Sequence, residues 1–239
     1  MQRHDGRATD QLRPLTLETN APGYAAGRVL AQLGNTIVLC TCSIEPAVPE
    51  FLVGQGKGWL TAEYSMLPGS TMGRKSRDRS GKVDGRSVEI QRLIGRSLRA
   101  VTNLEALGER TLWVDCDVLQ ADGGTRVTAI SGAWVAVYQA LTRTAGKYSI
   151  DPERVLPESV AAVSVGLLND NVILDLNYLE DRDADVDLNL VMTGNGKLVE
   201  VQAGGEEATF IPEQLQEMLR LGQQGIEAIT ELQLQVARS

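Results

Sequence analysis

The chain has 239 residues, of which 43% are hydrophobic and 23% are charged, and its formal net charge is −8, which is the composition of a globular protein with a sizeable core. No apolar run approaches the roughly 20 residues of a transmembrane helix, and the N-terminus has no signal-peptide pattern, so we expect a cytoplasmic protein without membrane contact. The single histidine, His4, excludes hydrolysis by paired histidines and disfavours a Ser-His-Asp triad, which leaves carboxylates, arginines, a metal ion or the substrate itself to carry any chemistry.

The first predicted elements are two strands within residues 27–45. The segment reads GRVLAQLGNTIVLCTCSIE, in which two short apolar, β-branched runs flank the turn residues Gly34 and Asn35. The cysteines Cys40 and Cys42 lie in the second run, and Cys116 lies in another apolar segment. This context favours buried, reduced thiols over a zinc site, because no second closely spaced pair of soft ligands exists.

A basic segment follows, and it contrasts with the acidic remainder of the chain. Residues 74–99 hold nine basic and three acidic residues, whereas residues 151–239 hold five basic and seventeen acidic residues. Such a strip can bind a polyanion locally although the whole protein is acidic. Its first part contains Arg74, Arg77 and Arg79 and almost no large apolar residue, which predicts an exposed loop.

Helical spacing of apolar residues predicts a helix from about Arg86 to Val101. Arg86 lies one turn before Ile90 and shares the apolar side of this helix. An inward-facing arginine near a helix start requires an anionic partner. Two simpler interpretations remain open, namely that Arg86 extends to solvent or pairs with a carboxylate of the protein.

The segment TLWVDCDVL, residues 111–119, alternates apolar and polar residues and predicts a half-buried strand. After it, ADGGTR places Gly123 and Gly124 before Thr125 and Arg126, and apolar residues from Ile130 onward predict a helix. Glycines allow backbone N–H groups to converge at the start of a helix, and Arg126 adds a forked donor suited to phosphate oxygens. An ordinary strand-to-helix turn with a capping threonine is the alternative.

Further strands are expected within residues 159–168, 171–179, 186–193 and 197–203, and a last helix is expected from Pro212. An acidic cluster, YLEDRDADVDLNL, interrupts these strands. Asp181 and Asp187 could lie at the ends of neighbouring strands and share a Mg²⁺ ion, although such clusters are commonly solvated turns. Two carboxylates, two arginines and a glycine turn form a plausible set for phosphoryl transfer.

Strands outnumber helices and come in hairpin-like groups, which predicts a mixed α/β fold. No linker rich in proline or serine divides the chain, so we expect one domain over residues 1–239.

Several long motifs occur in the same order as in a known family. They are DGRATDQLRP, GNTIVLCTCSIE, GQGKGWLTAEYSMLP, EIQRLIGRSLRAV, LGERTLWVDCDVLQADGGTR and VDLNLVMTGNGKLVEVQ. On these motifs the chain resembles the ribonuclease PH family of phosphate-dependent 3′-to-5′ exoribonucleases, from Arg3 to the last helix. The resemblance implies a compact βαβα-type domain and a nucleotidyltransferase that trims the 3′ ends of transfer RNA precursors, with ribosomal RNA ends as possible further substrates.

The resemblance also implies roles for individual residues. Arg86, Gly124, Thr125 and Arg126 match the family's phosphate-binding residues. Asp181 and Asp187 match its catalytic, metal-linked carboxylates, with Mg²⁺ as the expected ion. Arg74, Arg77 and Arg79 resemble its RNA-guiding loop. Inorganic phosphate is the implied co-substrate, and a hexamer built as a trimer of dimers is the implied assembly.

The chain departs from the family pattern where members read roughly EVQGTAEG and this sequence has EVQAGGEEA, which puts the contacts of Gln202 to Glu206 in doubt. Asn177 occupies a position that varies between acidic and polar residues, and no role is assigned to it. A non-catalytic RNA-binding subunit of an exosome-like ring is the alternative function. A small-molecule phosphotransferase is disfavoured, because no nucleotide-binding loop is recognisable and the basic strip would have no purpose.

Overall fold

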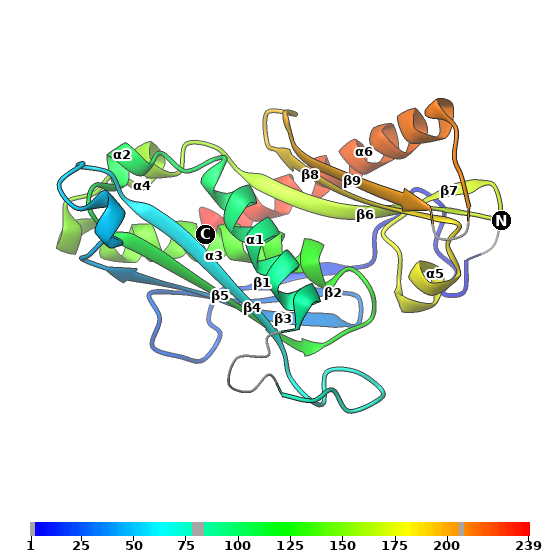
Figure 1. The fold of residues 1–239 in the computed structure, drawn as a ribbon, viewed down its shortest axis with the longest axis horizontal. Helices are drawn as coiled ribbons and strands as arrows, with labels where there is room; N and C mark the ends of the chain where they lie inside the picture. The colour runs from blue at the N-terminus through cyan, green and yellow to red at the C-terminus, as the bar shows by residue number, and fades with distance from the viewer. Residues whose placement is uncertain (1–2, 78–83, 206–207) are drawn as a thin grey trace.

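The computed structural model describes residues 3–77, 84–205 and 208–239, and it shows a mixed α/β fold with two sheets (Figure 1). The first sheet has the order β1-β2-β3-β5-β4, and all its neighbouring strands are antiparallel except β4 and β5. Its strands are β1 (Leu15–Glu18), β2 (Gly27–Leu33), β3 (Thr36–Glu45), β4 (Trp59–Met66) and β5 (Thr111–Gln120). The predicted hairpin at Gly34 is confirmed, with Leu33 paired to Thr36.

Four helices belong to this first part of the chain. They are α1 (Gly85–Arg99), α2 (Leu104–Leu107), α3 (Thr125–Tyr148) and α4 (Pro152–Val155), and a single 3₁₀ turn, η1, spans Glu50–Leu52. Helix α1 buries Ile90, Leu93, Ile94 and Leu98, as their helical spacing predicted. It connects the parallel strands β4 and β5, which need a crossover rather than a tight turn.

The second sheet has the order β7-β6-β8-β9 and is antiparallel throughout. Its strands are β6 (Val160–Leu168), β7 (Asn171–Leu174), β8 (Val186–Thr193) and β9 (Leu198–Gly205), the short helix α5 (Tyr178–Asp183) separates β7 from β8, and α6 (Pro212–Ala237) follows. Every residue of β6 is buried, because one face of this strand meets α3 and the other meets α6. This explains why its sequence is apolar without alternation.

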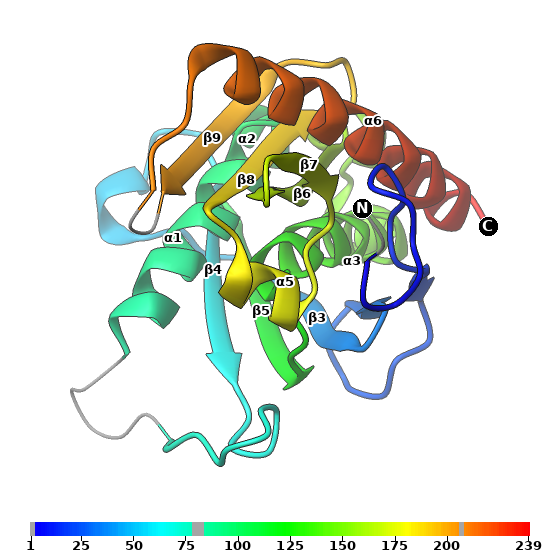
Figure 2. The same cartoon turned by 90° about the vertical axis from the view of Figure 1, so that its right-hand side faces the viewer.

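The elements form four layers, in the order first sheet, helices α1 and α3, second sheet, and α6 (Figure 2). Helix α3 lies between the sheets, and it is buried on every side from Val127 to Val137. The start of α3 lies beside α5 and the first turn of α1 (Figure 2).

Two strands of the first sheet were not predicted from the sequence. Strand β4 lies in a glycine-rich segment, although Leu60, Ala62 and Tyr64 alternate as buried residues within it. Strand β1 is short and pairs only with β2. No helix in the described ranges combines the length and apolar character that a membrane span requires.

Candidate functional site

The glycine turn connects β5 to α3, and its backbone requires glycine at two positions. Gly123 has φ +74° and Gly124 has φ +69°, both in the left-handed region. A Cβ atom on Gly123 would lie 2.7 Å from the carbonyl oxygen of Leu176 and 2.6 Å from the carbonyl carbon of Asn177. The turn is therefore in direct backbone contact with the segment that leads into α5.

A cavity of about 220 Å³ opens at the start of α3. It is lined by all six residues that the sequence predicted for phosphate binding and catalysis: Arg86, Gly124, Thr125, Arg126, Asp181 and Asp187. These residues come from α1, α3, α5 and β8, so the fold brings together segments separated by about a hundred positions in the sequence. Ser164, Ala184 and Asn189 complete the lining.

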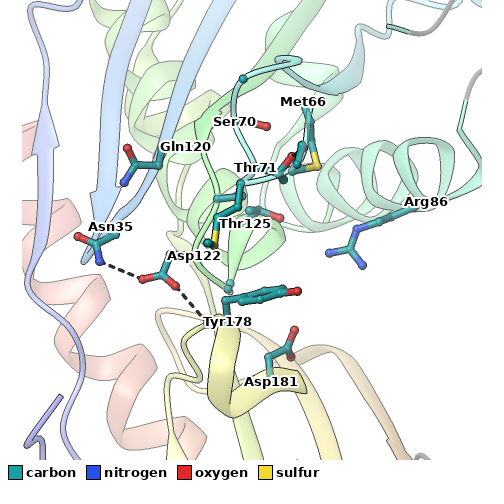
Figure 3. Close-up of a pocket in the computed structure, with 16 residues that line it drawn as sticks. Asn35, Met66, Ser70, Thr71, Arg86, Gln120, Asp122, Thr125, Tyr178 and Asp181 are labelled. Carbon is teal, nitrogen blue, oxygen red and sulfur yellow. Dashed lines mark hydrogen bonds between the residues drawn. The ribbon is translucent and has the colours of Figure 1, made fainter. Parts of the chain in front are cut away.

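Arg86 does not face the core, and the predicted inward direction of its side chain was wrong. The residue is exposed, and Figure 3 shows its guanidinium extending from α1 toward Asp181 and Tyr178. The physical reason is that Arg86 lies in the first turn of α1. At this end of the helix the apolar side no longer contacts the core and borders the cavity instead. Asp84 caps the helix by accepting a hydrogen bond of 3.2 Å from the Arg86 backbone N–H.

Arg126 lies at the wall of the cavity and is held from two sides. Its Nη1 atom lies 3.1 Å from a carboxylate oxygen of Glu89 on α1 and 3.0 Å from the side-chain oxygen of Gln202 on β9. Gln202 immediately precedes the residues that depart from the family pattern, and its contact with Arg126 is now defined. Glu206, at the end of that segment, lies outside the described residues.

Thr125 is not the cap of α3, because the cap position belongs to Gly124. The Thr125 hydroxyl instead accepts a buried hydrogen bond of 2.8 Å from the Tyr64 hydroxyl. Since this hydroxyl uses a lone pair for Tyr64, its own hydrogen can be donated to an anion in the cavity.

The two predicted carboxylates line the same cavity, but only one of them belongs to a strand. Asp187 is the second residue of β8, whereas Asp181 lies on α5, which corrects the expectation that both lie at strand ends. The physical reason that a helix forms here is a capping box. The Asn177 side chain accepts a hydrogen bond from the Glu180 N–H at 3.0 Å, and the Glu180 side chain accepts one from the Asn177 N–H at 3.0 Å. Asn177, which had no assigned role, thus starts the helix that carries Asp181.

Within the described ranges, no group of three or more histidine, cysteine, aspartate or glutamate residues could hold a metal ion by itself. The two cavity carboxylates nevertheless fit Mg²⁺, because this ion is commonly held by one or two carboxylates together with substrate phosphates and water. Asn189 donates a long hydrogen bond of 3.4 Å to Asp187 and orients that carboxylate along β8.

A larger cavity of about 710 Å³ adjoins the first and shares Arg86, Gly124, Thr125 and Asp181 with it (Figure 3). Its remaining lining includes Asn35, Ser70, Gln120, Asp122 and Tyr178, none of which was predicted. These residues come from turns, a strand end and the start of α5, so no single local sequence pattern could have identified them.

Polar groups in the larger cavity are arranged around Asp122. One carboxylate oxygen of Asp122 accepts a 3.1 Å bond from the Asn35 side chain, and the other accepts a 3.4 Å bond from the Tyr178 backbone (Figure 3). The Ser70 hydroxyl is buried and, in the part of the chain that the structure describes, has no hydrogen-bond partner. A buried hydroxyl of this kind gains a hydrogen bond when a polar ligand enters.

The predicted RNA-guiding loop is exposed beside this cavity. Arg74 and Arg77 are exposed, while Lys75 between them forms an ion pair of 2.7 Å with Asp84 at the start of α1. The third predicted residue, Arg79, lies outside the described residues. The loop is therefore anchored near Arg86 while its two described arginines point to solvent.

Comparison with known proteins gives family matches along most of the chain. Residues 11–142 match the model of the 3′ exoribonuclease family, domain 1, and residues 158–225 match domain 2 of the same family. Ribonuclease PH of Rhodopirellula baltica is 55% identical over 231 residues, which cover 95% of this chain and 94% of the relative. Ribonuclease PH of Bacillus subtilis is 51% identical over 238 residues, which cover 98% of this chain and 96% of the relative.

Two solved structures share the fold at low sequence identity. Rice Rrp46 has a TM-score of 0.80 and 21% identity, covering 99% of this chain and all of its own. A chain of the Archaeoglobus fulgidus exosome, solved with RNA bound to the active site, has a TM-score of 0.78 and 20% identity. The match covers 96% of this chain and 92% of the exosome chain. The family matches and the two relatives above half identity decide the classification. The chain belongs to the ribonuclease PH family of 3′ exoribonucleases.

Proposed function

We propose that the 220 Å³ cavity holds inorganic phosphate and that the adjoining 710 Å³ cavity receives the 3′ end of an RNA. The observation that carries this proposal is the convergence of Arg86, the turn of residues 124–126, Asp181 and Asp187 around the smaller cavity. A small polar space with two arginines at a helix N-terminus suits a phosphate ion in size and charge.

The protein is a phosphorolytic 3′-to-5′ exoribonuclease that acts on transfer RNA, and phosphate is its co-substrate. Each cycle shortens the RNA by one nucleotide and releases that nucleotide as a nucleoside diphosphate. Transfer RNA precursors are the substrates that we propose for this activity.

In the proposed mechanism the phosphate lies on the turn of residues 124–126, between the guanidinium groups of Arg86 and Arg126. One of its oxygens attacks the phosphorus of the terminal phosphodiester, and the 3′ oxygen of the penultimate nucleotide leaves. No histidine is required, because phosphate is already an ionised nucleophile. The arginines hold the reactants in line and stabilise the negative charge of the transition state, which are the main requirements of phosphoryl transfer.

Asp181 and Asp187 would hold Mg²⁺, and such an ion would offset charge on the transferring group. The alternative role for one of the two is that of a carboxylic acid that protonates the leaving oxygen. Both carboxylates line the small cavity together with the arginines, and Asp181 also lines the larger cavity proposed for the RNA end.

The larger cavity offers groups that suit a nucleoside. The Tyr178 ring lies along its wall, where it can stack on a base, and Asp122 and the buried Ser70 hydroxyl can bond to ribose hydroxyls (Figure 3). Arg74 and Arg77, with Arg79, would guide the preceding phosphates toward this cavity.

We also propose a single domain, a hexameric ring and a cytoplasmic location. Packing of α3 against both sheets supports the single domain. Exposed apolar residues on β9, Leu198 and Val201, lie at an edge of the second sheet and support assembly with further copies. The three cysteines are free and buried, as expected in a reducing compartment.

Incubating the chain with a 3′-extended transfer RNA, with and without phosphate, tests the function. We expect release of nucleoside diphosphates only when phosphate is present. A non-catalytic ring subunit would bind the RNA and leave it intact, and a hydrolase would release monophosphates without added phosphate. Either result would contradict the proposal.

A further inference from the structure

Three arginines of the N-terminal segment are buried in the protein, and none of them has a place in the mechanism above. Arg3, Arg7 and Arg13 have exposed fractions of 2%, 9% and 5%. All three pair with the fully buried carboxylates Asp175 and Glu180, which lie shortly before and within α5, and Arg7 also pairs with Asp5. Burying so many charges is costly unless each is paired and hydrogen-bonded, which indicates that this cluster has a specific role.

Arg13 stands out in this cluster, because it contacts both halves of the candidate site. Its Nε and Nη2 atoms bind the two carboxylate oxygens of Asp175 at 2.9 and 2.6 Å. The same guanidinium donates to the backbone carbonyl of Leu176 at 3.2 Å. On its other side it donates to the carbonyls of Asp122, at 2.5 Å, and Gly123, at 3.4 Å.

The two segments that Arg13 connects belong to different parts of the fold. Residues 122–124 follow β5 of the first sheet and lead into α3, which carries Arg126. Residues 175–177 follow β7 of the second sheet and lead into α5, which carries Asp181. Gly123 is in close contact with the backbone of residues 176–178 in the same place, so the spacing of the segments is defined by this one junction.

We propose that Arg13, paired with Asp175, is a positioning residue that sets the separation between the phosphate turn and Asp181 on α5. This inference rests on the proposed function of those two groups. Asp175 has φ +56°, an uncommon conformation for a residue other than glycine, and this conformation directs its carboxylate to Arg13. Arginine is required because five donors in one plane can bind a carboxylate and the carbonyls of two separate segments at once, whereas lysine cannot.

The test compares Arg13→Lys with the unaltered chain in steady-state phosphorolysis and in direct binding of radiolabelled phosphate. Displacement of reacting groups by about 1 Å can lower turnover by about 100-fold, and we expect a fall in kcat of that order. Phosphate binding should stay within about threefold, because Arg86 and the start of α3 remain in place. Arg110→Lys is the matched control, since Arg110 also donates to two carbonyls, of Leu107 and Tyr148, but far from the cavity.

A second variant keeps the inference testable if Arg13→Lys does not fold. Asp175→Asn keeps the shape of the Asp175 side chain but removes the charge that binds the Arg13 guanidinium. It should show the same combination of low kcat and retained phosphate binding. Both variants are also assayed at low temperature with a stabilising osmolyte, where a defect caused only by partial unfolding recovers and a positioning defect persists.

The outcomes separate this inference from the proposed function. An unaltered chain that releases no diphosphate would overturn the proposed function and this inference together. An active unaltered chain beside folded variants with kcat within threefold would overturn the positioning role alone. A loss of kcat and of phosphate binding in equal proportion, recovered at low temperature, would assign Arg13 a purely structural role.

Discussion

Arg126 donates a hydrogen bond of 3.0 Å to the side-chain oxygen of Gln202, and this contact joins the start of α3 to strand β9. Strand β9 is paired to β8, which carries Asp187, so Gln202 connects the predicted phosphate ligand to the strand that carries the opposite carboxylate. The residues that depart from the family pattern begin after Gln202, so the contact between Gln202 and Arg126 does not depend on them. The guanidinium of Arg126 is held in place before any ligand arrives, as preorganised charge stabilisation requires.

The first prediction concerns Arg126 itself. Replacing it with alanine removes the charge and the fork that face the cavity, and we expect kcat/KM for phosphate to fall about 100- to 1,000-fold, or roughly 3–4 kcal/mol. Arg126→Lys should lie between this variant and the unaltered chain, because lysine keeps the charge but loses the fork. Steady-state kinetics at varied phosphate and RNA binding by fluorescence anisotropy check the prediction.

Arg143→Ala is the matched control, because Arg143 is an exposed arginine on the same helix, distant from the cavity. RNA binding should survive in all three variants. If Arg126→Ala instead loses RNA binding while its KM for phosphate is unchanged, Arg126 belongs to the RNA site.

The second prediction is a variant, Glu89→Gln, that lowers the KM for phosphate. Glu89 forms a 3.1 Å ion pair with Arg126 and is partly exposed, so it competes with phosphate for the same guanidinium. Partly exposed pairs contribute about 0.2–1 kcal/mol, and Glu89→Gln should therefore lower the KM for phosphate by up to about fivefold. Glu217→Gln breaks a similar pair with Arg220 on α6 and should leave KM unchanged. A higher KM in Glu89→Gln would show that Glu89 orients Arg126 rather than competing for it.

The third prediction concerns the basic loop. Replacing Arg74, Arg77 and Arg79 together with glutamine should weaken RNA binding and flatten its dependence on salt. Each lost contact with a single-stranded phosphate removes about 0.7 from the slope of log K against log salt concentration. The KM for phosphate should not change, because Arg74 and Arg77 are exposed and do not line the small cavity.

The control for this variant removes three exposed arginines from the acidic part of the chain, Arg154, Arg220 and Arg238. It changes the net charge by the same amount, so any effect of overall charge on RNA binding appears in both. Equal salt slopes in the two variants would contradict a guiding role for the loop.

The fold was predictable from sequence wherever the local pattern carried the information. The hairpin at Gly34, the alternation of β5 and the helix from Pro212 were all confirmed. Strand β4 was missed because it follows a glycine-rich segment and pairs in parallel with a strand about fifty residues later. Helix α5 was missed although Asn177 and Glu180 have the spacing of a capping box, because the acidic cluster dominated the interpretation.

The site was predictable only in part, for a related reason. Gly124 and Arg126 were candidates because the turn chemistry is local, and Asp181 and Asp187 were candidates because they lie in an acidic cluster; the family resemblance pointed to the same four residues. Gln202 and Arg13 could not be identified, because each acts through a contact with a residue distant in the sequence. Long-range hydrogen bonds leave no periodicity in the residues that form them.

The last prediction uses the tyrosine beneath the cavity. Burial raises the pKa of Tyr64 above its ordinary value, although its hydrogen bond with Thr125 and the charges of Arg86 and Arg126 act in the opposite direction. The Cys116 side chain, which also faces it, contributes to the increase. The folded protein therefore keeps the neutral phenol at a pH where the unfolded chain has begun to lose this proton.

The sign of the pH dependence follows from this difference between the two states. The stability that the neutral Tyr64 contributes is complete below about pH 10 and is lost as the pH rises toward the folded pKa. Tyr64→Phe has no proton to lose, so its urea midpoint should fall less than that of the unaltered chain between about pH 9 and pH 11. Tyr24→Phe, at a fully exposed position, should behave like the unaltered chain. If the urea midpoints of Tyr64→Phe and the unaltered chain fall by the same amount over this pH range, the neutral phenol of Tyr64, which is bonded to Thr125, does not contribute the predicted stability.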